Sequence, residues 1–68
     1  MPFDVYIVRY GQPDRELVKA NTTARQAIRL LGSYISGKRR PKDLEQAFAI
    51  GSRFGWHYSQ SELRRLIA

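Results

Sequence analysis

The sequence predicts an α+β fold in which an N-terminal two-stranded antiparallel β-hairpin packs on two amphipathic helices and a short C-terminal helix. Three observations predict it. Two strand-like runs flank a turn within residues 3–20, apolar side chains recur at helical spacing after residue 23, and Pro and Gly divide the remainder into short segments. A chain of 68 residues is expected to form one small domain, over residues 1–68, of marginal stability.

The predicted hairpin covers residues 3–20. Residues 3–10 are rich in β-branched and aromatic side chains, which favours a strand, and residues 16–20 form a shorter return strand after the turn residues Gly11 and Pro13. Because two strands alone are barely stable in water, we expect helices to cover one side. Alternation places Phe3, Val5 and Ile7 on one side and Tyr6, Val8 and Tyr10 on the other.

The first predicted helix covers residues 23–36. Thr23 and Gln26 have the spacing of a capping box, in which each side chain accepts a hydrogen bond from the backbone amide of the other residue. Arg25 and Arg29 lie on the polar side of this helix. The apolar stripe, which is expected to face the core, consists of Ala24, Ala27, Ile28, Leu31, Tyr34 and Ile35.

A basic loop is predicted over residues 37–41. Gly32, Gly37 and Lys38 have the spacing of a phosphate-binding loop, but such a loop follows a strand and carries Ser or Thr after the lysine. Here a helix precedes the loop and Arg39 follows the lysine, so we reject a nucleotide site. We expect Gly37 to end the helix in a left-handed conformation, with the basic residues beside the helix carbonyls.

The second predicted helix covers residues 41–54, and a short third helix covers residues 60–67. Pro41 suits a first helical turn, because the amide that proline lacks would be unpaired there. Ser59 and Glu62 form another capping box before the third helix. The buried stripe expected for the second helix is Leu44, Ala47, Phe48, Gly51 and Phe54.

Composition limits the compartment and the partners. The chain has no cysteine, which excludes disulfides and fits a reducing compartment. It shows neither a signal-peptide pattern nor an apolar run of the roughly 20 residues that span a bilayer. We therefore expect a cytoplasmic protein without membrane contact. Its 12 Lys and Arg against 6 Asp and Glu give a net charge of +6, which favours polyanionic partners.

No group of residues predicts catalysis. His57 is the only histidine, and it has no second histidine or cysteine with which to share a metal ion. Asp43 and Glu45 are two residues apart in a predicted helix, so they point away from each other. No serine has the sequence context of a nucleophile elbow. We expect no enzymatic activity, no metal, no cofactor and no small-molecule substrate.

The basic residues between positions 25 and 42 are the strongest functional feature, because this span contains six Lys and Arg and no acidic residue. Arginine presents a planar set of donors to phosphate, and each neutralised phosphate releases counterions. The alternative is an ordinary solvated charged face. We expect an exposed polyanion-binding strip formed by Arg25, Arg29, Lys38, Arg39, Arg40 and Lys42, joined by Arg53 from the second predicted helix.

Three aromatic residues, Tyr6, Tyr10 and Trp56, form the second candidate surface. An open hairpin edge invites strand pairing with a partner or with a second copy of the chain, and these aromatics would then contact that protein. Alternatively, Tyr6 and Tyr10 stack on bases, as in proteins that bind single strands. The remaining interpretation is burial of the tyrosines under a loop or terminus, with Trp56 as a lid on the core.

Residues 43–63, DLEQAFAIGSRFGWHYSQSEL, resemble the C-terminal half of Nif11-like domains. The N-terminal hairpin departs from that all-helical family. The resemblance implies a non-catalytic recognition module of bacterial origin and indicates no functional residues. The residues that match in order are Ala49, Ile50, Gly55, Trp56, Tyr58, Ser59, Glu62 and Leu63.

The sequence therefore predicts a small, non-enzymatic basic protein of bacterial or phage type. It is expected to dock on nucleic acid or on a nucleoprotein complex and to regulate or inhibit that target. The alternative is a protein–protein adaptor or homodimer that uses the hairpin edge and the exposed aromatic residues, with the positive charge incidental.

Overall fold

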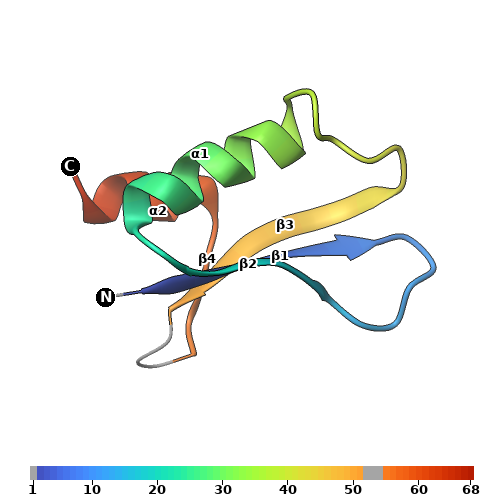
Figure 1. Cartoon of the computed structure of the whole chain (residues 1–68), viewed down its shortest axis with the longest axis horizontal. Helices are drawn as coiled ribbons and strands as arrows, with labels where there is room; N and C mark the ends of the chain where they lie inside the picture. The colour runs from blue at the N-terminus through green and yellow to red at the C-terminus, as the bar shows by residue number, and fades with distance from the viewer. Residues whose placement is uncertain (1, 52–54) are drawn as a thin grey trace.

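The computed structural model describes residues 2–51 and 55–68 and has an α+β fold (Figure 1). The four strands form one antiparallel sheet in the order β2-β1-β3-β4, and both helices lie on the same face of it. The predicted architecture, a two-stranded hairpin with three helices, is therefore wrong. In chain order the described elements are β1 (Phe3–Arg9), β2 (Glu16–Thr22), α1 (Ala24–Ile35), β3 (Leu44–Gly51), β4 (His57–Tyr58) and α2 (Gln60–Leu66).

The main correction concerns the helix predicted over 41–54. Its described part contains strand β3, which pairs with β1 along its whole length, from Phe3 opposite Gly51 to Arg9 opposite Leu44. Residues 52–54, where that helix was expected to end, lie outside the described residues. Pairing with β1 satisfies the backbone groups of both strands, and this long-range gain outweighs the local helical pattern.

The apolar spacing was misleading because β3 is a central strand with neighbours on both sides. The consecutive residues Phe48 and Ala49 are both buried, one from each face of the sheet, so the strand lacks the alternation of a half-exposed strand. Pro41 does not start a helix, because its carbonyl instead accepts a hydrogen bond from the Leu44 amide in a turn, at 3.3 Å.

The β1–β2 hairpin lies where the sequence predicts one, although its register is irregular. Asn21 has a positive φ of 60°, and its amide donates to the Asp4 carboxylate at 2.9 Å. The buried Thr22 hydroxyl donates to the Phe3 carbonyl at 2.8 Å. These bonds hold the end of β2 against the start of β1, immediately before α1 begins.

Helix α1 begins with the predicted capping box. The Thr23 hydroxyl accepts from the Gln26 amide at 3.1 Å, and the Gln26 side-chain oxygen accepts from the Thr23 amide at 2.9 Å. A second capping box joins Ser59 and Glu62 at the start of α2. Neither helix in the described ranges is long and apolar enough to cross a bilayer.

The core lies between the helices and the sheet. Both helices and the two central strands contribute to it, and partly buried residues such as Leu30 pack around it. The helix-facing side of β1 is buried as predicted. The cluster of buried residues consists of Phe3, Val5, Ala27, Leu31, Ala49 and Leu63.

The end of α1 differs from its prediction. Ser36 is the C-cap, and Gly37 does not have the positive φ of a left-handed terminator. Glycine is required there for space instead, because a Cβ on Gly37 would lie 2.7 Å from the Cα of Ser33 and 2.8 Å from its carbonyl oxygen. The chain therefore turns back tightly against the last turn of the helix and leads into the basic loop.

Candidate nucleic-acid interface

The described members of the predicted basic strip are all exposed. Both salt bridges found among the described residues belong to Arg9, which contacts Glu16 at 3.2 Å and Asp43 at 2.7 Å. The cations of the strip are thus not neutralised by acidic side chains of the described chain. Arg53, the remaining predicted member, lies outside the described residues.

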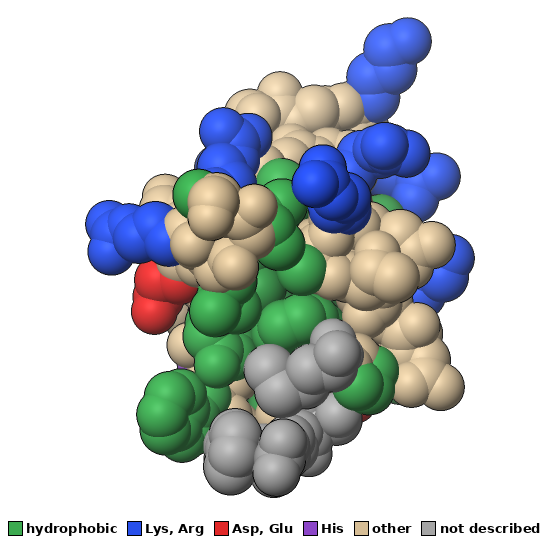
Figure 2. All heavy atoms as spheres, turned by 90° about the vertical axis from the view of Figure 1, so that its left-hand side faces the viewer, with side chains coloured by type: hydrophobic (Ala, Val, Ile, Leu, Met, Phe, Trp, Pro, Cys, Tyr) green, Lys and Arg blue, Asp and Glu red, His purple; other side chains and the backbone are tan. Residues whose placement is uncertain are grey.

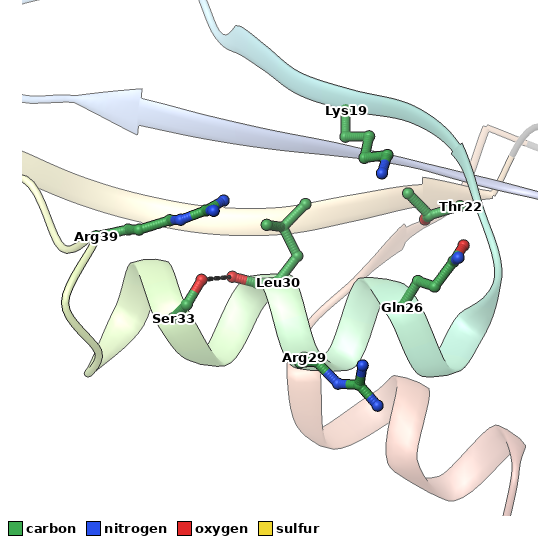
Figure 3. A pocket seen from close by; sticks show the side chains of 7 residues that line it. All are labelled: Lys19, Thr22, Gln26, Arg29, Leu30, Ser33 and Arg39. Atoms are coloured by element: carbon green, nitrogen blue, oxygen red, sulfur yellow. Dashed lines mark hydrogen bonds between the residues drawn. The ribbon is translucent and has the colours of Figure 1, made fainter.

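A hollow of about 410 Å³ lies between β2 and α1 and gathers cations from three parts of the chain. Lys19 comes from β2, Arg29 from α1, and Arg39 from the connection between α1 and β3. In Figure 3 the Lys19 and Arg39 side chains extend over the gap between the strand and the helix, with Leu30 between them. No acidic residue is among those lining this hollow in the part of the chain that the structure describes.

Local structure explains how each wall is built. Gln26, Leu30 and Ser33 are three or four residues apart, so they share the side of α1 that faces β2. Arg29 lines the edge of the hollow, but its side chain points toward α2, away from Lys19 and Arg39 (Figure 3). The Arg39 amide donates to the Ser33 carbonyl at 3.2 Å, which brings the start of the basic loop back against the helix. The Arg39 side chain can therefore reach the same hollow as Gln26, which lies two turns before Ser33 in α1.

The rest of the basic strip is distributed around this hollow. Arg25 lines a second hollow of about 230 Å³ with Arg29, Ile28 and Ile67, so Arg29 belongs to both. Figure 2 shows Lys and Arg side chains gathered over the helical layer at the end of the molecule where both termini lie. The sequence prediction of neighbouring cations on the outer side of α1 is thus matched for Arg25 and Arg29.

The basic loop contributes less to the hollow than the sequence suggested. The Arg40 guanidinium donates to the Ile35 carbonyl, where it caps the C-terminal end of α1. Lys38 and Lys42 are exposed and line neither hollow. Among the predicted cations, Arg39 is the one whose guanidinium extends over the larger hollow, and Arg29 lines its edge (Figure 3).

Lys19 is the functional candidate that sequence reasoning missed. It lies in a predicted strand, outside the basic span that begins at Arg25. Its place opposite Arg39 follows from β2 being the edge strand next to α1, and residue spacing alone does not show this. The only sequence signal is that Lys19 precedes the first capping box by a few residues.

The aromatic residues of the uncovered sheet face form a row. Phe48 stacks on His57, with ring centroids 4.7 Å apart, and on Tyr6, with centroids 6.0 Å apart. The Arg15 guanidinium lies over the Tyr6 ring, 4.6 Å from its centroid. The Arg15 guanidinium thus occupies one face of the Tyr6 ring on which a base would otherwise stack.

The three aromatic residues of the second candidate surface do not form one patch. Tyr10 and Trp56 are each 64% exposed. Trp56 lies beside Gly51, which pairs with Phe3, whereas Tyr10 follows the opposite end of β1, roughly 23 Å away at the rise of an extended strand. Tyr6 lies between these two ends and is half-buried.

Comparison of the chain with protein-family models, curated proteins and solved structures finds no match. The interpretation of the site therefore depends on its geometry. The stretch that resembles Nif11-like domains forms β3, β4 and the start of α2 in its described part, and the resemblance stays a prediction.

Proposed function

We propose that this protein is a non-enzymatic nucleic-acid-binding module that docks through the cations around the β2–α1 hollow. The observation that carries the proposal is that Lys19 and Arg39, from two separate segments, extend over one hollow without acidic lining among the described residues (Figure 3). Like charges that face one hollow repel each other, so a polyanion that neutralises them gains free energy. The proposed effect is to regulate or inhibit the nucleic acid or nucleoprotein complex that is bound.

The proposed contacts are mainly to the phosphate backbone. Lys and Arg bind phosphate through charge-assisted hydrogen bonds, and each neutralised phosphate releases condensed counterions. The affinity should consequently fall steeply as salt rises. We also propose a cytoplasmic location, because a chain without cysteine requires no oxidising compartment.

Fluorescence anisotropy with labelled oligonucleotides, measured over a series of NaCl concentrations, tests this function. Replacing both Lys19→Gln and Arg39→Gln should weaken binding and reduce the slope of log affinity against log salt by about 1.4 to 1.8, since each lost phosphate contact removes about 0.7 to 0.9. The matched control is Lys38→Gln with Lys42→Gln. It removes the same charge from exposed residues that do not line the hollow.

The expected result is a clearly smaller loss of affinity in the control than in the hollow variant. No salt-dependent binding of single-stranded or duplex oligonucleotides would overturn the proposal. Equal losses in the two double variants would show that net charge alone, and not the hollow, governs binding.

The second candidate is a protein–protein adaptor, favoured by the sheet face that lies opposite the helices. Leu17 pairs with Tyr6 on that face and is 52% exposed. A partner bound there should remain bound at moderately high salt and be lost when Leu17→Lys introduces a charge. The same substitution should leave oligonucleotide affinity unreduced if the hollow is the functional site.

A further inference from the structure

The charged and amide groups that remain free in the β2–α1 hollow are hydrogen-bond donors, whereas its two hydroxyl groups use their protons within the protein. The Thr22 hydroxyl donates to the Phe3 carbonyl, and the Ser33 hydroxyl donates to the Leu30 carbonyl at 2.8 Å. The Gln26 oxygen accepts from the Thr23 amide, so the side-chain NH₂ group is what Gln26 can still offer. Together with Lys19 and Arg39, this NH₂ group is suited to an anionic ligand that accepts hydrogen bonds.

The shape of the hollow restricts the ligand further. Its cations lie on opposite sides, with Lys19 on the strand and Arg39 at the end of the helix, and the apolar Leu30 lies between them (Figure 3). A volume of about 410 Å³ is within the range of small-ligand sites. A phosphate can be held between the cations while a sugar or base covers the exposed part of Leu30.

Insertion of the helices into the major groove of duplex DNA fits this arrangement poorly. The major groove of DNA is about 12 Å wide and admits one helix. The neighbouring helix α2 packs directly beside α1, because the Gln60 amide donates to the Ile28 carbonyl at 3.0 Å and a Cβ on Gly32 would lie 2.9 Å from the Gln60 nitrogen. Two adjacent helices with axes about 8 to 10 Å apart are too wide to enter the groove together.

From these three features we infer that the β2–α1 hollow binds one nucleotide unit of a single-stranded nucleic acid. Lys19 and Arg39 hold the phosphate, and the Gln26 NH₂ group donates to a phosphate, sugar or base oxygen. This inference rests on the proposed function, and it adds the strandedness of the ligand and the role of Gln26.

The most specific test is Gln26→Glu, because it replaces a hydrogen-bond donor of the hollow with a negatively charged acceptor and keeps the helix cap. A glutamate at this position completes a capping box with Thr23 equally well, and its charge is favourable in the first turn of a helix. Its second oxygen places a negative charge where Gln26 has a donor. The matched control is Ser61→Glu, which makes the same charge change at an exposed position of α2 that does not line the hollow.

Affinities would be measured by anisotropy at one fixed NaCl concentration. The probes are oligothymidylate of about 12 nucleotides, within the range covered by single-strand binders, and its duplex with oligoadenylate. We expect tighter binding of the single strand, and a loss of about tenfold or more for Gln26→Glu, the size expected when a hydrogen bond to a charged group is removed. Ser61→Glu should change the affinity by much less. Thermal unfolding of both variants verifies that they fold.

The outcomes separate this inference from the proposed function. Equal or tighter binding of the duplex, or equal effects of Gln26→Glu and Ser61→Glu, would overturn the single-strand inference while salt-dependent nucleic-acid binding still stands. Failure of both probes to bind at any salt concentration would overturn the proposed function as well.

Discussion

At the scale of single residues, several side chains serve the fold and the candidate site together. One end of the Gln26 amide caps α1, and the other end faces the hollow. Arg39 is brought to the hollow by a backbone hydrogen bond to Ser33, next to the glycine that lets the chain approach the helix. The site is therefore sensitive to substitutions that contact no ligand.

Gly37 provides a prediction at this scale. In Gly37→Ala the new methyl group would lie 2.7 Å from the Cα of Ser33, a distance that requires the backbone to shift. We expect the free energy of unfolding to fall by about 1 to 3 kcal/mol, as for other overpacked sites. Because Arg39 follows in the same turn, oligonucleotide affinity should also fall.

Chemical denaturation and anisotropy measure these two effects, and Lys38→Ala is the control for stability, since Lys38 is exposed in the same loop. Unchanged stability of Gly37→Ala would show that the loop can move away from α1 without cost. In that case the position of Arg39 would not depend on the tight turn.

At the scale of elements, the capping of α2 predicts a dependence on pH. The Ser59 amide donates to the Glu62 carboxylate at 3.0 Å, and this bond, aided by the Ser59 hydroxyl and nearby Arg65, lowers the pKa of Glu62. A carboxylate with a lower pKa in the folded state stabilises the fold above its unfolded pKa, about 4.3 for Glu. That contribution is lost as the pH falls through the folded-state pKa.

We therefore expect Glu62→Gln to have a lower Tm than the original chain near pH 6, and the difference to vanish near pH 3. Both proteins share every other titrating group, so the change in the difference reports on Glu62 alone. Calorimetry at the two pH values measures it. A constant Tm difference across this range would mean that the carboxylate charge does not contribute to capping.

The elements also show which parts of the fold the sequence can predict. Helix α1 and both capping boxes depend on residues three or four positions apart, and local chemistry was sufficient to find them. β3 depends on β1, whose paired residues lie 35 to 48 positions earlier in the chain, and Phe48 and Ala49 gave no alternating pattern to reveal it. The apolar residues of β3 matched a helical spacing because side chains on both faces of this strand are buried.

At the scale of the whole molecule, the candidate site was predictable only in part. The sequence identified Arg29 and Arg39 because they lie in one basic span. It could not select them from Lys38 and Lys42, nor add Lys19, because the selection depends on the edge position of β2 beside α1. The net charge can thus be predicted from composition, whereas predicting which charged side chains lie close together requires the topology of the sheet.

The excess of positive charge leads to a last prediction, in which salt acts on folding and on binding in opposite directions. The net charge is +6, and Arg9 makes both of the salt bridges found in the described ranges. Raising NaCl from about 0.05 to about 0.5 M shortens the Debye length from roughly 14 to roughly 4 Å, which weakens repulsion among the unpaired cations. The Tm of the free protein should rise, while its affinity for oligonucleotides falls.

The double variant Lys19→Gln with Arg39→Gln should flatten both dependences, because the same two charges repel each other in the free protein and attract phosphate in the complex. Arg9→Gln is the opposite control: it removes a cation whose interactions with Glu16 and Asp43 are attractive, so the Tm of this variant should rise more with salt than that of the original chain. Differential scanning fluorimetry over the salt series measures all three proteins. A Tm that falls with added NaCl would show that attractive interactions between charged side chains outweigh repulsive ones in the free protein. In that case a polyanion would gain no free energy by relieving repulsion among the cations of the hollow.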